Sequence, residues 1–101
     1  MSAYIIVYRE TPVIDPEAIA EYSRQNLENA AKFQSEFGTQ PKVLYGQCEG
    51  LEGPTPDGVV MLKFADRETA KAWYDSKEYQ NAIPFRQKAA DWRVVLVEGV
   101  A

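Results

Sequence analysis

The chain has 101 residues, of which 46% are hydrophobic and 26% charged, so it can bury one core, and we expect a single domain over residues 1–101. The net charge of −4 and the absence of a basic cluster argue against nucleic acid as a partner, because phosphate groups select basic surfaces. There is one cysteine, no signal segment and no apolar run long enough to span a membrane, so we expect a cytoplasmic protein without membrane contact.

The first two expected elements are a strand and a helix. Residues 3–9 are rich in β-branched and aromatic side chains, which predicts a strand that is apolar on both faces. Asp15 and Pro16 are typical of a helix start, because aspartate caps free backbone N–H groups and proline fits the first helical position. Apolar and small side chains then recur every three or four residues as far as Phe37, and Gly38 favours termination. This pattern predicts one uninterrupted helix.

Two strands joined by a loop are expected next. Residues 42–49 predict a strand, residues 50–58 contain three glycines and two prolines and predict a loop, and residues 59–64 predict another strand. Alternation on the latter strand places Val60, Leu62 and Phe64 toward the helices, and Val59, Met61 and Lys63 on the opposite face. Cys48 shares a face of its strand with Leu44 and Gly46, so we expect it to be buried.

A second helical region follows, in two pieces. Asp66 is the expected cap of the first piece, and Asp75 or Ser76 is the expected cap of the second, which runs from about residue 77 to residue 90. Pro84 lacks a backbone N–H, so we expect it to kink or split this second piece. The final strand is expected at residues 93–100.

The order β-α-β-β-α-β predicts an α+β fold, a ferredoxin-like sandwich with a four-stranded antiparallel sheet and its helices on one face. The other face of the sheet would then meet water, yet the first, third and last strands carry apolar residues on both faces. Burying one side chain such as Val59 or Met61 contributes roughly 1.5–3 kcal/mol, and an exposed apolar face of this kind usually marks an interface. We therefore expect a homodimer in which two sheets meet face to face.

Short motifs spread in order over nearly the whole chain resemble the family known as domain of unknown function 1330. They are Asp15-Pro16-Glu17-Ala18, Leu51-Glu52-Gly53, Lys63-Phe64 with Asp66, Ala70-Lys71-Ala72-Trp73-Tyr74-Asp75-Ser76, Glu78-Tyr79-Gln80 and Val94-Val95-Leu96-Val97-Glu98-Gly99. The resemblance implies a ferredoxin-like domain of the dimeric α/β-barrel superfamily, and it implies no established activity. That superfamily includes cofactor-free monooxygenases, isomerases, cyclases, haem enzymes and ligand-sensing domains, and a fold alone does not choose among them.

The absence of histidine limits the chemistry that the chain can perform. A histidine haem ligand, a histidine base and a histidine metal site are all impossible, and the carboxylates and Cys48 show no metal-ligand spacing. We therefore expect neither a metal nor a cofactor. Ser76 has no partner base and is better interpreted as a helix cap than as a nucleophile.

Polar side chains on the sheet are the first group of candidate site residues. Tyr45, Gln47, Glu49 and Lys63 are expected to share the face away from the helices, where Tyr8 can join them. In an apolar cavity, such groups could polarise an aromatic or keto substrate, and a buried lysine or glutamate could act as acid or base. The favoured alternative is a contact at the dimer rim, such as Lys63 paired with Glu49.

The second helical region supplies the other candidates. Trp73 is expected to pack on the sheet and to line a pocket only if the helix kink opens one. Tyr79 and Arg86 fall on one helix face, where they could hold a carboxylate-bearing ligand. The favoured alternative for Arg86 is a surface salt bridge with Glu78.

Three functions are compatible with these patterns. The first is the binding of a small apolar or aromatic-acid molecule between the helices and the sheet. The second is a cofactor-independent enzyme of monooxygenase, isomerase or cyclase type, and the third is a structural or interaction module without a pocket. A cavity of roughly 300 Å³ or more with at least two convergent polar groups would favour the first two over the third.

Overall fold

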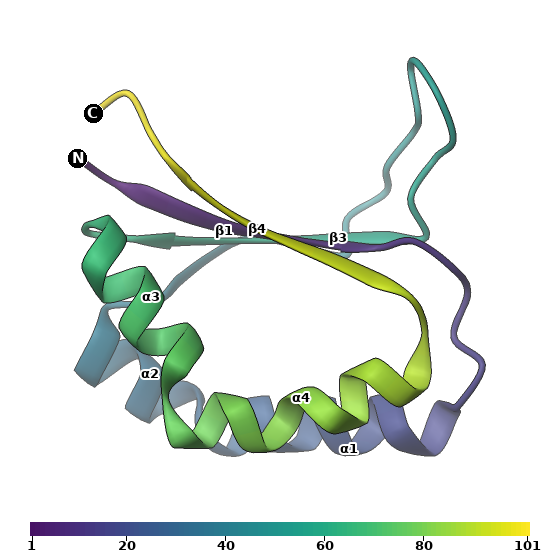
Figure 1. Ribbon diagram of the computed structural model, residues 1–101, viewed down its shortest axis with the longest axis horizontal. Helices are drawn as coiled ribbons and strands as arrows, with labels where there is room; N and C mark the ends of the chain where they lie inside the picture. The colour runs from purple at the N-terminus through teal and green to yellow at the C-terminus, as the bar shows by residue number, and fades with distance from the viewer.

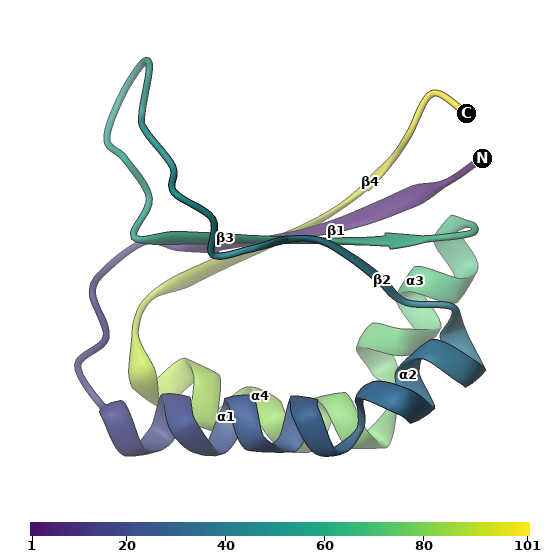
Figure 2. The same ribbon diagram turned by 180° about the vertical axis from the view of Figure 1, so that it is seen from behind.

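The computed structural model describes residues 1–101, and all of its helices lie on one face of a four-stranded sheet (Figures 1 and 2). The strands are β1 (Ala3–Arg9), β2 (Gln40–Leu44), β3 (Gly58–Phe64) and β4 (Trp92–Glu98). The helices are α1 (Pro16–Glu28), α2 (Ala30–Phe37), α3 (Arg67–Asp75) and α4 (Lys77–Ala89). The predicted α+β, ferredoxin-like architecture is confirmed, with each of the two helical regions divided in two. None of the helices is both long and apolar enough to cross a membrane.

The sheet is antiparallel throughout, in the order β2-β3-β1-β4. Its register places Ile5 between Leu62 and Leu96, and the next residue along, Ile6, between Met61 and Val95. Because side chains alternate along a strand, the row through Ile5 faces the helices and the row through Ile6 faces away. The burial agrees, since Ile5 is enclosed in the core and Ile6 is only half-buried.

The predicted strand at residues 42–49 is wrong in its second half. β2 already ends at Leu44, because Tyr45 adopts a left-handed backbone conformation with φ 56° that an extended strand does not accommodate. The chain then enters a long loop that projects from the sheet on the side opposite the helices (Figure 1). Glu49 is exposed on this loop. Cys48 is half-buried there, with its Sγ 3.4 Å from the carbonyl oxygen of Pro56, so its predicted burial on a strand is also wrong.

The first helical region begins as predicted but does not continue unbroken. Asp15 caps α1 by accepting a hydrogen bond of 3.0 Å from the backbone N–H of Ala18. Asn29 ends α1 because its side-chain amide donates to the carbonyl of Gln25, an oxygen that its own backbone N–H also uses. α2 then runs to Gly38, whose φ of 61° gives the left-handed stop that glycine allows.

Ser76 joins the two pieces of the second helical region. Its hydroxyl donates to the carbonyl of Trp73 at the end of α3 and accepts from the backbone N–H of Tyr79 at the start of α4. The predicted caps at Asp66 and Ser76 are confirmed. Pro84, however, does not split α4, which runs through it without a break. Pro84 and Gln80 are both exposed, so the Gln80 carbonyl that loses its N–H partner can bond to water.

The helices cover the sheet at two levels. α3 packs directly on β1, β3 and β4, whereas α1 and α4 pack mainly along each other and lie farther from the sheet in both views (Figures 1 and 2). Aromatic side chains occupy much of the space between the levels. The ring of Trp73 lies 4.1 Å from that of Tyr79, 5.5 Å from that of Phe64 and 5.9 Å from that of Phe33, measured between centroids.

The far face of the sheet carries an apolar row at its centre. Val95, Ile6, Met61 and Val43 follow one another across all four strands in the observed register. Val95 and Val97, on the edge strand β4, continue this apolar surface and are 36% and 43% exposed. The face opposite the helices is therefore apolar and uncovered within one chain.

Candidate ligand-binding cavity

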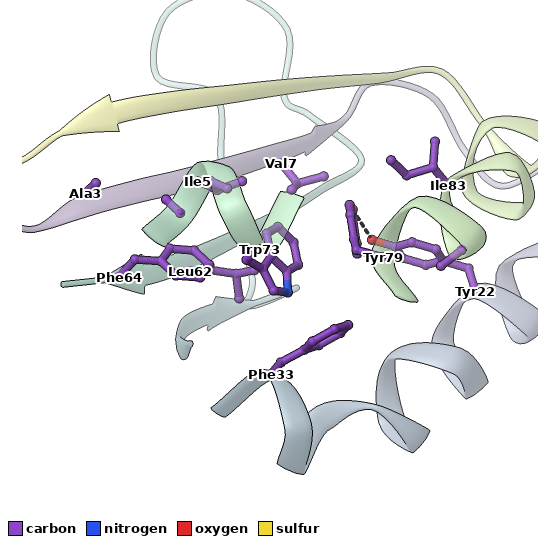
Figure 3. Packing of buried hydrophobic residues seen from close by; sticks show 12 residues of the cluster. Ala3, Ile5, Val7, Tyr22, Phe33, Leu62, Phe64, Trp73, Tyr79 and Ile83 are labelled. Atoms are coloured by element: carbon purple, nitrogen blue, oxygen red, sulfur yellow. Dashed lines mark hydrogen bonds between the residues drawn. The ribbon is translucent and has the colours of Figure 1, made fainter. Parts of the chain in front are cut away.

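A cavity of about 680 Å³ lies between the first helical region and the β2 side of the sheet. Val7, Val60 and Leu62 form its wall on the sheet, and Phe33, Tyr22, Trp73 and Tyr79 form its wall on the helices. Figure 3 shows these helix side chains grouped below Val7, with Leu62 beside Trp73. The mouth lies between α1 and the edge strand, where Leu27, Leu44 and Tyr45 are unusually exposed for their size, at 80%, 62% and 44%.

The sequence of the first helical region explains why this space is open. Tyr22 and Phe33 reach inward to the aromatic side chains of α3 and α4. Between them, the cavity is lined by Ser23, Asn26 and Ala30, which are too short to fill the distance from α1 to the sheet, and by Leu27, which is exposed at the mouth. Because α1 rests on α4 rather than on β2, no backbone closes the gap.

A pair of phenol groups forms the polar centre of the cavity wall. The hydroxyls of Tyr22 and Tyr79 share a hydrogen bond of 2.8 Å, drawn as a dashed line in Figure 3. Burial and the neighbouring Tyr22 raise the pKa of Tyr79 far above its ordinary value, so this phenol remains neutral. Since two hydroxyl protons serve one mutual bond, the pair retains one donor for a ligand.

Two further polar atoms are buried without a hydrogen-bond partner, and both residues line the same cavity. They are Oδ1 of Asn26, which can only accept, and Nε1 of Trp73, which can only donate. A buried polar atom without a partner is uncommon in a folded protein, because it loses its bond to water and gains nothing in exchange. Both residues therefore bring an unused hydrogen-bonding group into the wall of the cavity, beside the tyrosine pair.

Lys42 is the only charged residue that lines the cavity, and it lies at the exposed edge strand. The lining contains no carboxylate and no cysteine. The available chemistry is thus hydrogen bonding and apolar contact, without an internal carboxylate base or a thiol nucleophile.

The structure brings together three of the sequence-predicted site residues. Trp73 and Tyr79 line the cavity, and so does Tyr45. The prediction that Tyr45 faces away from the helices is wrong, because its positive φ turns the ring back beneath the sheet. There the ring stacks on the Arg9 guanidinium at 4.9 Å. Partial burial and the nearby Tyr22 raise the pKa of Tyr45, against the opposing charges of Arg9 and Arg86.

The other predicted site residues lie elsewhere. Tyr8 is on the far face, with the Arg93 guanidinium 4.7 Å from its ring, and Lys63 is on the same face, opposite Tyr4. Glu49 is on the projecting loop, whereas Lys63 pairs with Gln40 toward the other end of β3, so the two residues do not meet within one chain. Their expected contact across the dimer rim stays a prediction.

Arg86 also differs from its favoured interpretation. It is buried, and it forms no salt bridge, because Glu78 pairs instead with Lys32 at 2.8 Å. Arg86 lies beside the cavity rather than in its wall, although its charge acts on both Tyr45 and Tyr79.

Two residues that sequence reasoning did not identify are Tyr22 and Asn26. Both occupy the inward face of α1. Asn26 could have been noticed in the sequence, because its polar amide stands at a position where the helical repeat expects an apolar side chain. No comparable signal exists for Tyr22, whose partner Tyr79 lies 57 positions away in the sequence.

Solved structures from several bacteria share this fold. A protein of unknown function from Rhodopseudomonas palustris is 19% identical, with a TM-score of 0.68 over 99% of this chain and 83% of that one. A dimeric ferredoxin-like protein of unknown function from Jannaschia sp. CCS1 is 14% identical, with a TM-score of 0.72 over 98% of this chain and 100% of that one. A Nitrosomonas europaea protein named "putative antibiotic biosynthesis monooxygenase" is 16% identical, with a TM-score of 0.62 over 98% and 90% of the two chains.

No curated protein matches the chain. The family model described as "Domain of unknown function (DUF1330)" matches residues 2–100, which is nearly the whole sequence and includes every motif that suggested the resemblance. The chain belongs to this family.

Proposed function

We propose that the chain binds a small, largely apolar aromatic molecule, such as an aromatic acid, in the cavity between α1 and β2. The observation that carries the proposal is the pair of buried atoms without partners, Asn26 Oδ1 and Trp73 Nε1, in the wall of one apolar cavity. A bound molecule that offers both a donor and an acceptor would satisfy both atoms, and its ring would stack among Phe33, Trp73 and Tyr79. At about 680 Å³ the cavity is within the size range of small-molecule sites.

The charges at the mouth favour a ligand that carries a carboxylate at its outer end. Lys42 is positive, no carboxylate lines the cavity, and Leu27 and Leu44 offer apolar contact around the opening. An aromatic ring bound inside with its acid group toward Lys42 would leave no charge buried without a partner.

A thermal-shift screen of aromatic acids, hydroxy acids and keto acids tests the proposal. Ala30→Phe places a ring in the cavity, and we expect it to abolish every shift that the wild-type chain shows. Ala31→Phe is the matched control, since Ala31 is exposed on the same helix and does not line the cavity. The proposal fails if no compound raises the melting temperature, or if Ala30→Phe responds like Ala31→Phe.

The second candidate is a cofactor-independent enzyme of monooxygenase, isomerase or cyclase type. The Tyr22–Tyr79 pair favours it, because a neutral phenol can donate to a keto oxygen and stabilise negative charge that develops there. The lack of a carboxylate or thiol in the lining ranks this candidate below simple binding. The enzyme would become the first candidate if the chain converted a ligand found by the screen and if Tyr79→Phe lost this turnover but still bound the ligand.

We further propose that the chain forms a homodimer through the far face of its sheet. Relatives of the same fold are described as dimeric, and the apolar row from Val95 to Val43 is uncovered within one chain. Sedimentation at micromolar concentration should show a species of twice the chain mass. We also place the protein in the cytoplasm, where a reducing environment would keep Cys48 a free thiol, a location that cell fractionation can test.

A further inference from the structure

Arg86 is the only charged side chain that is buried in the core, at 4% exposure. It lies about one helical turn beyond Ile83 and two turns beyond Tyr79, on the buried face of α4. Arg9, Arg24 and Arg93 each pair with a carboxylate, whereas no carboxylate lies within salt-bridge distance of Arg86.

The interior compensates for this charge only in part. The ring of Trp92 lies 5.5 Å from the guanidinium carbon, and the C-terminal end of α4 is a favourable place for a cation. Neither feature accepts a hydrogen bond from the side chain, and Nε of Arg86 is buried without a partner. Since a buried cation normally requires a paired anion, the guanidinium lacks its complement within the chain.

A hollow of about 400 Å³ next to Arg86 provides room for that complement. It lies between α4 and β4, and Tyr74, Gln87, Asp91 and Trp92 line it together with Arg86. It shares no lining residue with the larger cavity, so the two are separate. The Trp92 ring offers aromatic surface beside the charge, Tyr74 adds a second ring to the lining, and the Gln87 amide offers another donor.

We propose that this hollow binds a small organic carboxylate. The two oxygens of the carboxylate accept hydrogen bonds from the planar fork of Arg86, which matches them in shape and charge. The organic part lies against Trp92 and Tyr74. A singly charged anion suits the hollow better than a phosphate, because one cation faces it and the exposed Asp91 opposes additional negative charge.

Benzoate is a suitable probe, titrated into the nitrogen-15-labelled full chain against sodium chloride of equal ionic strength. The Nε–H resonance of Arg86 and the indole N–H resonance of Trp92 are expected to shift saturably with benzoate and not with chloride. Arg86→Lys keeps the charge but loses the fork, so it should weaken binding at least tenfold. Asp91→Asn removes the opposing charge and should tighten it.

These variants also separate the site from a structural pairing of Arg86 with Asp91. If Arg86 served only to pair with Asp91, the Asp91→Asn variant would be less stable and would bind benzoate as the wild-type chain does. That result would overturn the proposal. Equal affinity in Arg86→Lys, or shifts that follow ionic strength alone, would overturn it as well. Ala30→Phe fills only the larger cavity and should leave benzoate binding at Arg86 intact, so the two proposed sites can fail independently.

Discussion

At the scale of single residues, the polar character of the cavity wall comes from hydroxyl and ring nitrogen atoms that are buried away from water. Tyr79 is almost fully buried, and its hydroxyl has the Tyr22 hydroxyl as its partner, 2.8 Å away. A phenolate at this position would lose its hydration and would lie beside a second phenol, so the folded chain holds the proton on Tyr79 well above the pH at which an unfolded chain releases it.

The raised pKa of Tyr79 predicts a loss of stability in alkaline solution. Above pH 10.0, the ordinary pKa of tyrosine, the unfolded chain releases this proton and the folded chain keeps it, so the unfolded state becomes more favourable as pH rises. The contribution of one such group is about 1.4 kcal/mol per pH unit. Urea unfolding of the wild-type chain and of Tyr79→Phe between pH 9 and pH 11 measures it, and the variant should show the shallower dependence. Identical slopes would contradict the burial of this phenol.

Residue-level prediction from the sequence succeeded where the local pattern was sufficient. Trp73 was correctly expected in the core. It also lines the cavity, but this space opens between α1 and β2 and not at a helix kink, which was the condition set by the prediction. Tyr45 was placed on the wrong face because a single positive φ, which alternation along a strand cannot reveal, turns it. The pairing of Tyr22 with Tyr79 depends on how α1 packs on α4, and the sequence around either tyrosine alone does not reveal it.

At the scale of elements, the helix starts were the most predictable features and the interruptions the least. Aspartate and serine caps act over three residues, so Asp15, Asp66 and Ser76 could be identified from the sequence. The break at Asn29 arises from a side-chain bond to its own helix, which competes with a pattern that otherwise favours continuation. The early end of β2 was equally hidden from the sequence. The residues after Leu44 still alternate as in a strand, although their pairing with β3 has stopped.

Ser76 links two elements and also positions two aromatic residues of the cavity. Ser76→Ala removes the cap of α4 and the hydrogen bond to the Trp73 carbonyl, so we expect a loss of about 1–2 kcal/mol in the free energy of unfolding. The near-ultraviolet circular dichroism of the stacked Trp73 and Tyr79 rings should weaken as well. Ser35→Ala, in an exposed position of α2, is the control and should change stability by less than about 0.5 kcal/mol. A variant as stable as this control would exclude the linking role.

At the scale of the whole molecule, the two faces of the sheet have different tasks. One face supports the helices and both hollows, and the other has no cover within the chain although an apolar row crosses it. The sequence predicted this asymmetry, because apolar residues on both faces of three strands exceed what one layer of helices can bury. A cavity between the helices and the sheet was expected, but its place at the β2 edge was not, since it results from the distance between α1 and β2.

Val97→Lys tests the proposed use of the far face. Val97 lies beside Tyr4 on that face and is 43% exposed in the single chain, so a lysine there should leave the fold of one chain intact. At an interface between two sheets, it would place two like charges in an apolar contact related by symmetry. We expect the variant to sediment as a monomer and its melting temperature to lose the dependence on protein concentration that a dimer shows. Val100→Lys is the control, because Val100 is fully exposed beyond the end of β4 and should leave the assembly unchanged. A Val97→Lys protein that still sediments at twice the chain mass would exclude this face as the interface.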